Sequence, residues 1–339
     1  MTRDRSWADL VVEETLEPDL PICDPHHHFW VHREGGHLRD ERYLIEDLIV
    51  DTSSGHNIVS TVFIECRAEY RTDGPLAMRP LGETEFVRAE AEKNASGELS
   101  PTRAAAGIIG HVDLTIGERA REVLEAQIAA GGGRFRGIRH SVSWDASDAV
   151  RNAYIHPPER QYYAADFRQG FAHLAPLGLT FEGWLYHPQL GDLADLARAF
   201  PATTIILNHL GGPLGIGPYA GRRDEVFADW KRSISELAGC PNVNVKLGGI
   251  QMDINGFGWE ERDRPPGSAE LAGATRRYYD HAIEAFGVSR AMFESNFPVD
   301  RLSCGYAVLW NAFKRIAAGF SADEKAALFH DTATRVYRL

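Results

Sequence analysis

Histidines end several short apolar segments of this 339-residue chain, and imidazole is a common ligand of divalent metal ions. The segment ICDPHHHF contains His26 and His28, separated by His27. Side chains alternate along a strand, so His26 and His28 share one face while His27 points the other way. Two imidazoles on one strand end suit two ligands of one metal ion. A solvated polar strand end is the alternative interpretation.

Three further segments end in the same way. GIRH ends at His140, GWLYH ends at His187 and TIILNH ends at His209. Each histidine taken alone is more often a packed or exposed side chain. If the segments are parallel strands of one barrel, however, their carboxyl ends meet at the face where such barrels place their active sites. The repeated pattern therefore predicts a metal site at that face.

The elements that must position these histidines alternate along the chain. Eight β-branched segments read as strands, and helical patterns separate them. The expected strands are 22–29, 59–66, 104–114, 135–144, 179–187, 203–209, 243–247 and 291–296. Alternation of strands and helices predicts a parallel α/β sheet, and eight units can close into a (β/α)₈ TIM barrel. An open doubly wound sheet is less well supported, because no G-x-G-x-x-G follows the first strand.

One helix is predicted over residues 116–130. Its apolar stripe is formed by Ala120, Val123, Leu124 and Ile128. Capping boxes are expected at its start, from Thr115 and Glu118, and before the last helix, from Ser321 and Glu324.

Composition narrows the class of protein. Hydrophobic residues make up 44% and charged residues 25%, which predicts a folded chain, here one barrel domain over residues 1–339 with a short extension at 1–20. The net charge of −12 argues against nucleic acid or an anionic membrane as the main partner. Four cysteines without a C-x-x-C pair, and no signal-peptide or membrane-spanning segment, favour a cytoplasmic protein. A small-molecule substrate is expected, and a homo-oligomer or a complex with a homologous subunit remains open.

Residues around the strand ends are candidates for substrate contact. The segments 70–82 and 255–268 are expected to form long loops over the same barrel face. Guanidinium groups at strand ends suit a substrate carboxylate, and aromatic rings suit a pocket wall. The candidates are Arg67, Arg71, Arg139, Trp184 and Tyr186, with Tyr70 as a further wall residue. An exposed or packing role is an equal alternative for each.

The H-x-H strand, the segment NHLGGP and the segment MFESNFPVD resemble the amidohydrolase superfamily. The similarity is greatest to its amidohydrolase-related branch, which includes sugar-acid lactonases and 2-pyrone-4,6-dicarboxylate lactonase. It extends from Cys23 to the C-terminal FHDTATRVYRL. The resemblance implies His26 and His28 as first-strand metal ligands, His187 as the fifth-strand ligand and His209 as the sixth-strand histidine.

The eighth strand departs from the family pattern. The family motif G-S-D-W-P carries an aspartate that binds metal and acts as general base, and the matching segment here is Glu294-Ser295-Asn296-Phe297-Pro298. An amide cannot take a proton from water, although its oxygen can still bind a metal or a substrate. Asp300 could replace the lost base or lie on the following loop. Glu294 shares the strand face of Asn296 and is expected to be a buried, hydrogen-bonded acid.

The second strand ends at Glu65, which we interpret as a further metal ligand or as the partner of Arg67 in an ion pair. The candidate ligands then number seven: His26, His28, Glu65, His140, His187, His209 and Asn296. One metal needs about three or four protein ligands. The excess predicts either two metals or one metal with substrate-binding side chains. Zinc is the expected ion, and iron or manganese, as one or two ions, are alternatives.

Three functions follow. The first is a metal-dependent hydrolase of a small carboxylate-bearing molecule, above all a lactone, in which the ion lowers the pKa of a bound water to about 7. His209, His140 or Glu65 would then supply the proton transfer lost at Asn296. The second is a dinuclear oxygen-activating monooxygenase. The third is a non-catalytic metal-binding partner subunit, which the loss of the basic aspartate motivates.

Overall fold

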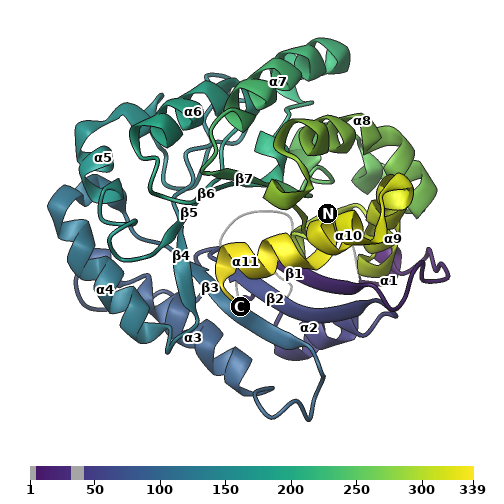
Figure 1. Ribbon diagram of the computed structural model, residues 1–339, viewed down its shortest axis with the longest axis horizontal. Helices are drawn as coiled ribbons and strands as arrows, with labels where there is room; N and C mark the ends of the chain where they lie inside the picture. Colours follow the sequence, from purple (N-terminus) through teal and green to yellow (C-terminus); the bar gives the residue numbers. More distant parts are fainter. Residues whose placement is uncertain (1–4, 32–41) are drawn as a thin grey trace.

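A computed structural model describes residues 5–31 and 42–339 of the chain. Its sheet has eight parallel strands, each hydrogen-bonded to the next in sequence order (Figure 1). The strands are β1 (Pro21–His27), β2 (Asn57–Ile64), β3 (Arg103–Gly110), β4 (Phe135–Arg139), β5 (Thr180–Gly183), β6 (Ile205–Leu207), β7 (Val243–Leu247) and β8 (Ala291–Phe293). All eight predicted strands are present, and the predicted (β/α)₈ barrel is confirmed.

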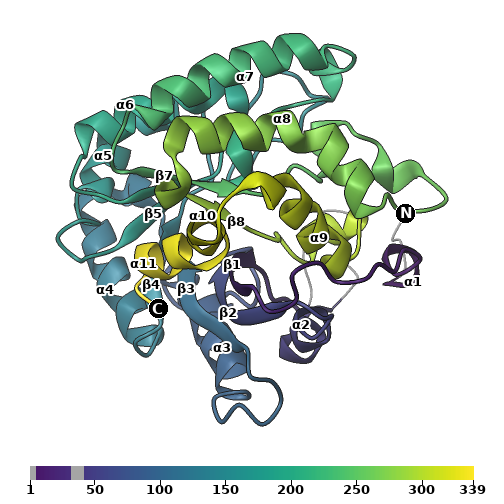
Figure 2. The same ribbon diagram turned by 45° about the vertical axis from the view of Figure 1, so that its right-hand side comes forward.

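Helices surround the strands, as Figures 1 and 2 show. A helix follows each strand, so the sequence alternates between the inner and outer layers of the barrel. These helices are α2 (Ile45–Thr52), α3 (Leu81–Glu92), α4 (Ala120–Ala130), α5 (Ala165–Phe171), α6 (Leu190–Ala199), α7 (Arg223–Ala238), α8 (Ser268–Phe286) and α9 (Tyr306–Ile316). The N-terminal α1 (Arg5–Ala8) and the C-terminal α10 (Ala322–Ala326) and α11 (Thr332–Tyr337) lie outside this alternation.

The barrel closes between its first and last strands. The His28 amide donates to the Phe297 carbonyl oxygen, and the Asn296 amide donates to the His26 carbonyl oxygen. Each of these hydrogen bonds has a donor–acceptor distance of 2.9 Å. The Asp24 carboxylate adds bonds from the Ser295 amide at 3.0 Å and from its hydroxyl at 2.6 Å. Closure therefore brings the H-x-H strand beside the eighth-strand motif, at the carboxyl end of both.

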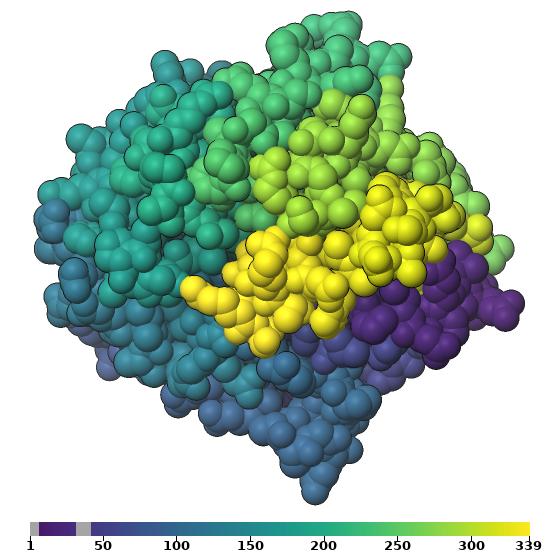
Figure 3. All heavy atoms as spheres, viewed as in Figure 1, coloured from purple at the N-terminus to yellow at the C-terminus, as the bar shows by residue number. Residues whose placement is uncertain are grey.

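Two apolar clusters hold the barrel. The larger one fills the layer between strands and helices. The smaller one lies inside the barrel, where alternate strand residues such as Val62, Ile64, Ile206 and Met292 pack together with Tyr337 of α11. Accordingly, α11 crosses the middle of the ring in Figure 1, and the C-terminal segment covers the centre of the same face in Figure 3. The last helix thus plugs the amino-terminal end of the barrel.

The helix predicted over residues 116–130 differs at its start. A 3₁₀ turn over Leu114–Arg119 precedes α4, and Gly117 has φ 62°. The capping box expected from Thr115 and Glu118 is wrong, because the Asp113 carboxylate accepts from the Thr115 amide at 3.0 Å instead. Ile128, placed in the apolar stripe, is 36% exposed. The predicted capping box of Ser321 and Glu324 is confirmed.

None of the helices in the described part of the chain is long and apolar enough to cross a membrane. The four cysteines, Cys23, Cys66, Cys240 and Cys304, are buried and free.

Candidate active site

The first strand presents His26 and His28 to the same side, as predicted. Their ring centroids are 4.9 Å apart, and both side chains are buried. His27 points away and packs edge-on against Phe29, with a centroid distance of 4.7 Å. The Nδ1 atom of His28 lies 2.8 Å from the Ile64 carbonyl oxygen, so Nδ1 carries the proton and Nε2 carries the lone pair. Strand alternation therefore positions two imidazoles at one end of the barrel.

His209 of the sixth strand joins this pair. Its ring centroid is 4.4 Å from that of His26. The backbone of His209 is left-handed, with φ 52°, a conformation that costs a non-glycine residue about 1–3 kcal/mol. The Glu294 carboxylate holds it there, because Oε1 accepts from the His209 amide at 3.2 Å and from Nδ1 at 2.7 Å. Glu294 is buried and hydrogen-bonded, as predicted.

A set of atoms suited to a divalent cation results. Ligand atoms of His26, His209 and Glu294 all lie within 4.8 Å of one another, and all three residues are buried. Glu294 Oε2 lies 2.6 Å from His26 Nδ1 and accepts no hydrogen bond within the described residues. Two imidazoles and a carboxylate are a common protein donor set for zinc. The residues therefore fit the metal that the family resemblance implies.

Buried charges surround the set. The Lys246 ammonium lies 3.4 Å from His26 Nδ1 and 2.8 Å from the Glu182 carboxylate. The Arg139 guanidinium lies 3.4 Å from His26 Nε2. Burial and the Lys246 charge hold the pKa of His26 well below its usual value, and burial also lowers the pKa of His209. Both imidazoles are thus neutral near pH 7, which is the form that binds metals.

Asn296 stands at the rim of this set. It adopts φ 55°, and its Oδ1 atom lies 3.4 Å from His28 Nε2. Its Nδ2 atom donates to the Asp300 carboxyl at 2.7 Å. Asp300 lies in a buried 3₁₀ turn over Val299–Leu302, where burial raises its pKa well above the usual value. Asp300 thus lies on the segment that follows the strand, one of the two expected alternatives, where it contacts Asn296 and lies outside the three-residue set.

His187 and His140, both predicted at strand ends, lie outside the set as well. The Nδ1 atom of His187 accepts from the Leu214 amide at 3.3 Å, and its ring packs against Tyr219 at 5.2 Å between centroids. His140 packs against His111 at 5.4 Å between centroids. His187 lies beyond the end of β5, in a 3₁₀ turn over His187–Gln189, and His140 directly follows β4; both rings contact partners other than His26, His209 and Glu294.

His140 nevertheless has one unusual feature. Its Nδ1 atom lies 3.3 Å from both the Val112 carbonyl oxygen and the Leu114 amide, while its Nε2 atom is buried and makes no hydrogen bond within the described residues. Burial lowers the pKa of His140 to about 4. The ring is therefore a neutral imidazole with one nitrogen not engaged by the protein.

Glu65, interpreted from the sequence as a metal ligand or as the partner of Arg67, contacts neither Arg67 nor the three-residue set within the described residues. Its Oε1 atom accepts from Arg139 Nε at 2.8 Å, and its Oε2 atom accepts from the Tyr154 hydroxyl at 2.7 Å. Arg139 counteracts the burial of Glu65 and keeps its pKa below the usual value. The pair is buried, with side-chain exposures of 8% and 0%. Glu65 therefore neutralises Arg139, and the structure does not bring it into the cation set.

The remaining substrate-contact candidates are distributed unevenly. The Arg67 guanidinium is exposed and lies 4.6 Å from the centre of the Tyr154 ring. Arg71 pairs with Glu85 at the surface. Trp184 packs edge-on against His209 at 4.7 Å between centroids and against Tyr186 at 5.8 Å. Trp184 thus packs beside the three-residue set through His209. Among the predicted arginines, Arg67 has no carboxylate partner within the described residues.

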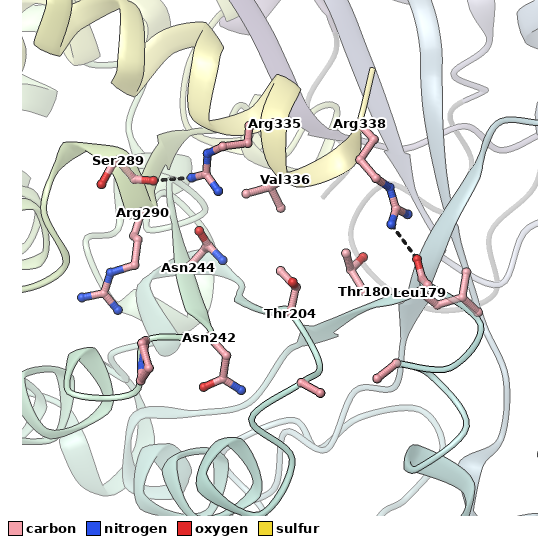
Figure 4. Close-up of a pocket in the computed structure, with 14 residues that line it drawn as sticks. Leu179, Thr180, Thr204, Asn242, Asn244, Ser289, Arg290, Arg335, Val336 and Arg338 are labelled. Carbon is pink, nitrogen blue, oxygen red and sulfur yellow. Dashed lines mark hydrogen bonds between the residues drawn. The ribbon is translucent and has the colours of Figure 1, made fainter.

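A cavity of about 490 Å³ lies at the opposite end of the barrel (Figure 4). Residues before β5, β6, β7 and β8 line it, together with Arg335, Val336 and Arg338 of the C-terminal segment. The arginines are bound to the backbone: Arg335 donates to the Ser289 carbonyl oxygen, and Arg338 donates to that of Gly178 at 2.7 Å. His26, His209 and Glu294 do not line this cavity, so we do not interpret the cavity as the active site.

Sequence reasoning missed the interior charges. Lys246 and Glu182 occupy inward positions of β7 and β5, and their ion pair is fully buried. A signal was present, because a charged residue alternates with β-branched residues in VNVKL. Its meaning depended on knowing which strand face was the interior.

The fold and the site define a class: a (β/α)₈ barrel with a buried imidazole–carboxylate cluster at the carboxyl ends of its strands. The family model for amidohydrolases matches residues 23–339, and the chain belongs to this family. It is 33% identical over 95% of its length, and over 99% of the relative, to the uncharacterized protein y4mH of Sinorhizobium fredii. It is 29% identical to an L-fucono-1,5-lactonase of Burkholderia multivorans, over 76% of this chain and 81% of the relative.

A solved amidohydrolase of Burkholderia multivorans with bound zinc is similar in fold. Its TM-score is 0.73 at 26% identity, with 94% of this chain and 99% of that chain covered. The predicted family is therefore confirmed.

Proposed function

We propose that this protein is a metal-dependent hydrolase that opens the ring of a small lactone, either a sugar-acid lactone or one that bears a carboxylate. The buried set of His26, His209 and Glu294 carries the proposal, since it offers a cation site at the end of the barrel where such enzymes act. The lactonase relatives and the zinc-bound amidohydrolase favour lactones and zinc.

The cation would be held by His26, His209 and Glu294, with His28 and Asn296 beside them. A divalent ion at this place would polarise the lactone carbonyl and acidify water. Trp184 would pack against the substrate ring next to His209. The amide of Asn296, fixed by Asp300, would offer Oδ1 to a substrate hydroxyl. The exposed guanidinium of Arg67 would bind a substrate carboxylate where one is present.

Proton transfer needs a group other than Asn296. Glu65 is a weak candidate, because both of its carboxylate oxygens already accept hydrogen bonds, from Arg139 and from Tyr154. We propose His140 as the acceptor, since its buried Nε2 atom makes no hydrogen bond within the described residues. In the tautomer that donates from Nδ1 to the Val112 carbonyl oxygen, Nε2 carries the lone pair that takes the proton.

The test is hydrolysis of a panel of 1,4- and 1,5-sugar lactones and of a dicarboxylate lactone, followed by proton release in the absence of oxygen. We expect turnover that a chelator abolishes and that added zinc restores. Elemental analysis should give one divalent ion per chain. Two iron or manganese ions with oxygen consumption would support the oxygenase instead, and a tightly bound metal without any turnover would support the non-catalytic subunit.

A second measurement separates the roles of the histidines. We expect His140→Asn to lose about 10²–10⁴-fold in kcat and to retain its metal, because it removes only proton transfer. His209→Ala should lose both activity and metal. Equal metal loss in both variants would contradict the assignment of His140.

A further inference from the structure

Two alternate positions of the eighth strand differ from the motif that the chain resembles. Position 294 carries glutamate where the motif has glycine, and position 296 carries asparagine where the motif has aspartate. Positions two apart lie on the same strand face. The chain has therefore lost one carboxylate at the strand end and gained one a step deeper in the barrel.

The Glu294 carboxylate uses its two oxygens differently. Oε1 holds His209 through the backbone amide and through Nδ1. Oε2 lies 2.6 Å from His26 Nδ1, yet accepts no hydrogen bond within the described residues. A fully buried carboxylate oxygen without a donor is costly, and a bound cation is one of the groups that offsets this cost. The Oε2 atom thus lies beside the imidazole of His26 and has lone pairs that could bind a cation.

The end of β7 is shaped around this side chain. A Cβ atom at Gly248 would overlap the Glu294 backbone oxygen and Cγ. A Cβ atom at Gly249, where φ is 64°, would overlap the His209 ring. Two consecutive glycines therefore leave room for Glu294 and His209 together, which is an observation independent of the Glu294 contacts.

The surrounding charges leave Glu294 without a cation of its own. Arg139 is neutralised by Glu65, and Lys246 by Glu182, in two fully or almost fully buried pairs. Glu294 makes no ion pair with Lys or Arg within the described residues. Its nearest side-chain contacts are the imidazoles of His26 and His209.

We propose that Glu294 supplies the anionic ligand oxygen of the cation site, the role that the resemblance gives to an aspartate at position 296. Asn296 is then a neutral hydrogen-bonding side chain at the rim. The inference rests on the cation site of the proposed function, but its test needs neither substrate nor turnover.

The experiment is calorimetric titration of the metal-free protein with Zn²⁺. Glu294→Gln should weaken binding by at least about 100-fold, since loss of an orienting partner alone costs 10–100-fold and loss of a ligand costs more. The matched control is Glu83→Gln, a neutral isostere of another buried carboxylate that lies outside the cation set. The control should bind Zn²⁺ within about threefold of the wild-type protein. Wild-type affinity in Glu294→Gln, or no binding by the wild-type protein, would overturn the proposal.

A charge-conserving variant guards against simple misfolding. Glu294→Gly should lose Zn²⁺ binding, and the double variant Glu294→Gly with Asn296→Asp should regain it, because the carboxylate returns to the position of the motif. The visible spectrum of the Co²⁺-loaded proteins gives a second readout of the ligands. If the double variant remains folded but does not bind Zn²⁺, the proposal that Glu294 takes the ligand role of an aspartate at position 296 is overturned. Binding that depends on Glu294 in a protein that hydrolyses no lactone would refute the proposed function and leave this inference standing.

Discussion

The two ends of the barrel use polar groups in opposite ways. At the carboxyl end, imidazoles and a carboxylate converge with coordination capacity left over, and His209 and Asn296 adopt left-handed backbone conformations there. At the amino end, the arginines around the cavity are bound to backbone carbonyl oxygens, and α11 seals the interior. Polar atoms without partners within the described residues, more than cavity size, distinguish the end at which we propose the chemistry from the opposite end.

A chain of buried polar contacts connects the two ends. The Tyr337 hydroxyl at the amino end donates to Glu182, and Glu182 pairs with Lys246. Lys246 in turn lies 3.4 Å from His26. The plug at one end thus helps to position charge at the other.

The largest contrast is expected in catalysis. His209→Ala should lower kcat/KM by at least about 10²–10³-fold, because it removes a proposed ligand of the cation that would stabilise the developing charge. Arg335→Ala, at the other end, should stay within about twofold of the wild-type protein. Steady-state lactone hydrolysis measures both. A loss in Arg335→Ala as large as that in His209→Ala would remove the distinction between the ends.

A buried and an exposed ion pair are expected to differ in how much they contribute to the free energy of unfolding. Arg139→Met leaves the Glu65 carboxylate buried without its cation and should lower the free energy of unfolding by about 3–5 kcal/mol. Arg71→Met breaks the exposed pair with Glu85 and should cost about 0–1 kcal/mol. Urea denaturation monitored by fluorescence gives both values. Similar losses would show that the Glu65–Arg139 pair is not buried in solution.

The polar link between the ends predicts a smaller effect. Tyr337→Phe removes one donor from the buried Glu182 carboxylate and should cost about 1–3 kcal/mol. Tyr163→Phe, at a 38% exposed ring, is the control and should be neutral within about 0.5 kcal/mol. Thermal unfolding distinguishes them, and equal values would contradict the link.

The smallest effect is expected in the pH dependence of stability, when the Asn296 side chain beside Asp300 is changed. Asn296→Asp places a second carboxyl beside Asp300, whose pKa burial already raises. A raised pKa in the folded state means that the folded protein binds more protons than the unfolded chain, so stability falls as pH rises. The variant should therefore lose about 1–2 kcal/mol relative to the wild-type protein at pH 8 and less at pH 5. A deficit that grows toward low pH would be inconsistent with this contact.

The barrel could be predicted because its signals are local. Strand runs such as Val243–Leu247 have the expected bounds, and alternation along ICDPHHHF placed His26 and His28 on one side. The candidate cation site could be predicted only in part. His187 lies beyond the end of β5 and His140 directly follows β4, and the direction of each ring depends on tertiary contacts such as that of Leu214 with His187.

Contacts between side chains on different strands could not be predicted from the sequence for the same reason. Glu65 was interpreted as a metal ligand or as the ion-pair partner of Arg67, two residues away, yet its partner is Arg139 on β4. Glu294 was expected to be a buried acid, but its contacts with two imidazoles follow from the closure of β8 against β1. Distances across the barrel depend on how the strands are staggered, which no single segment encodes.

The most direct test of the central claim is a crystal structure of the zinc-loaded protein with an anomalous difference map at the zinc edge. We predict one peak about 2.0–2.2 Å from ligand atoms of His26, His209 and Glu294. A peak held instead by Glu65 or His187, or no peak at the carboxyl end of the barrel, would contradict it.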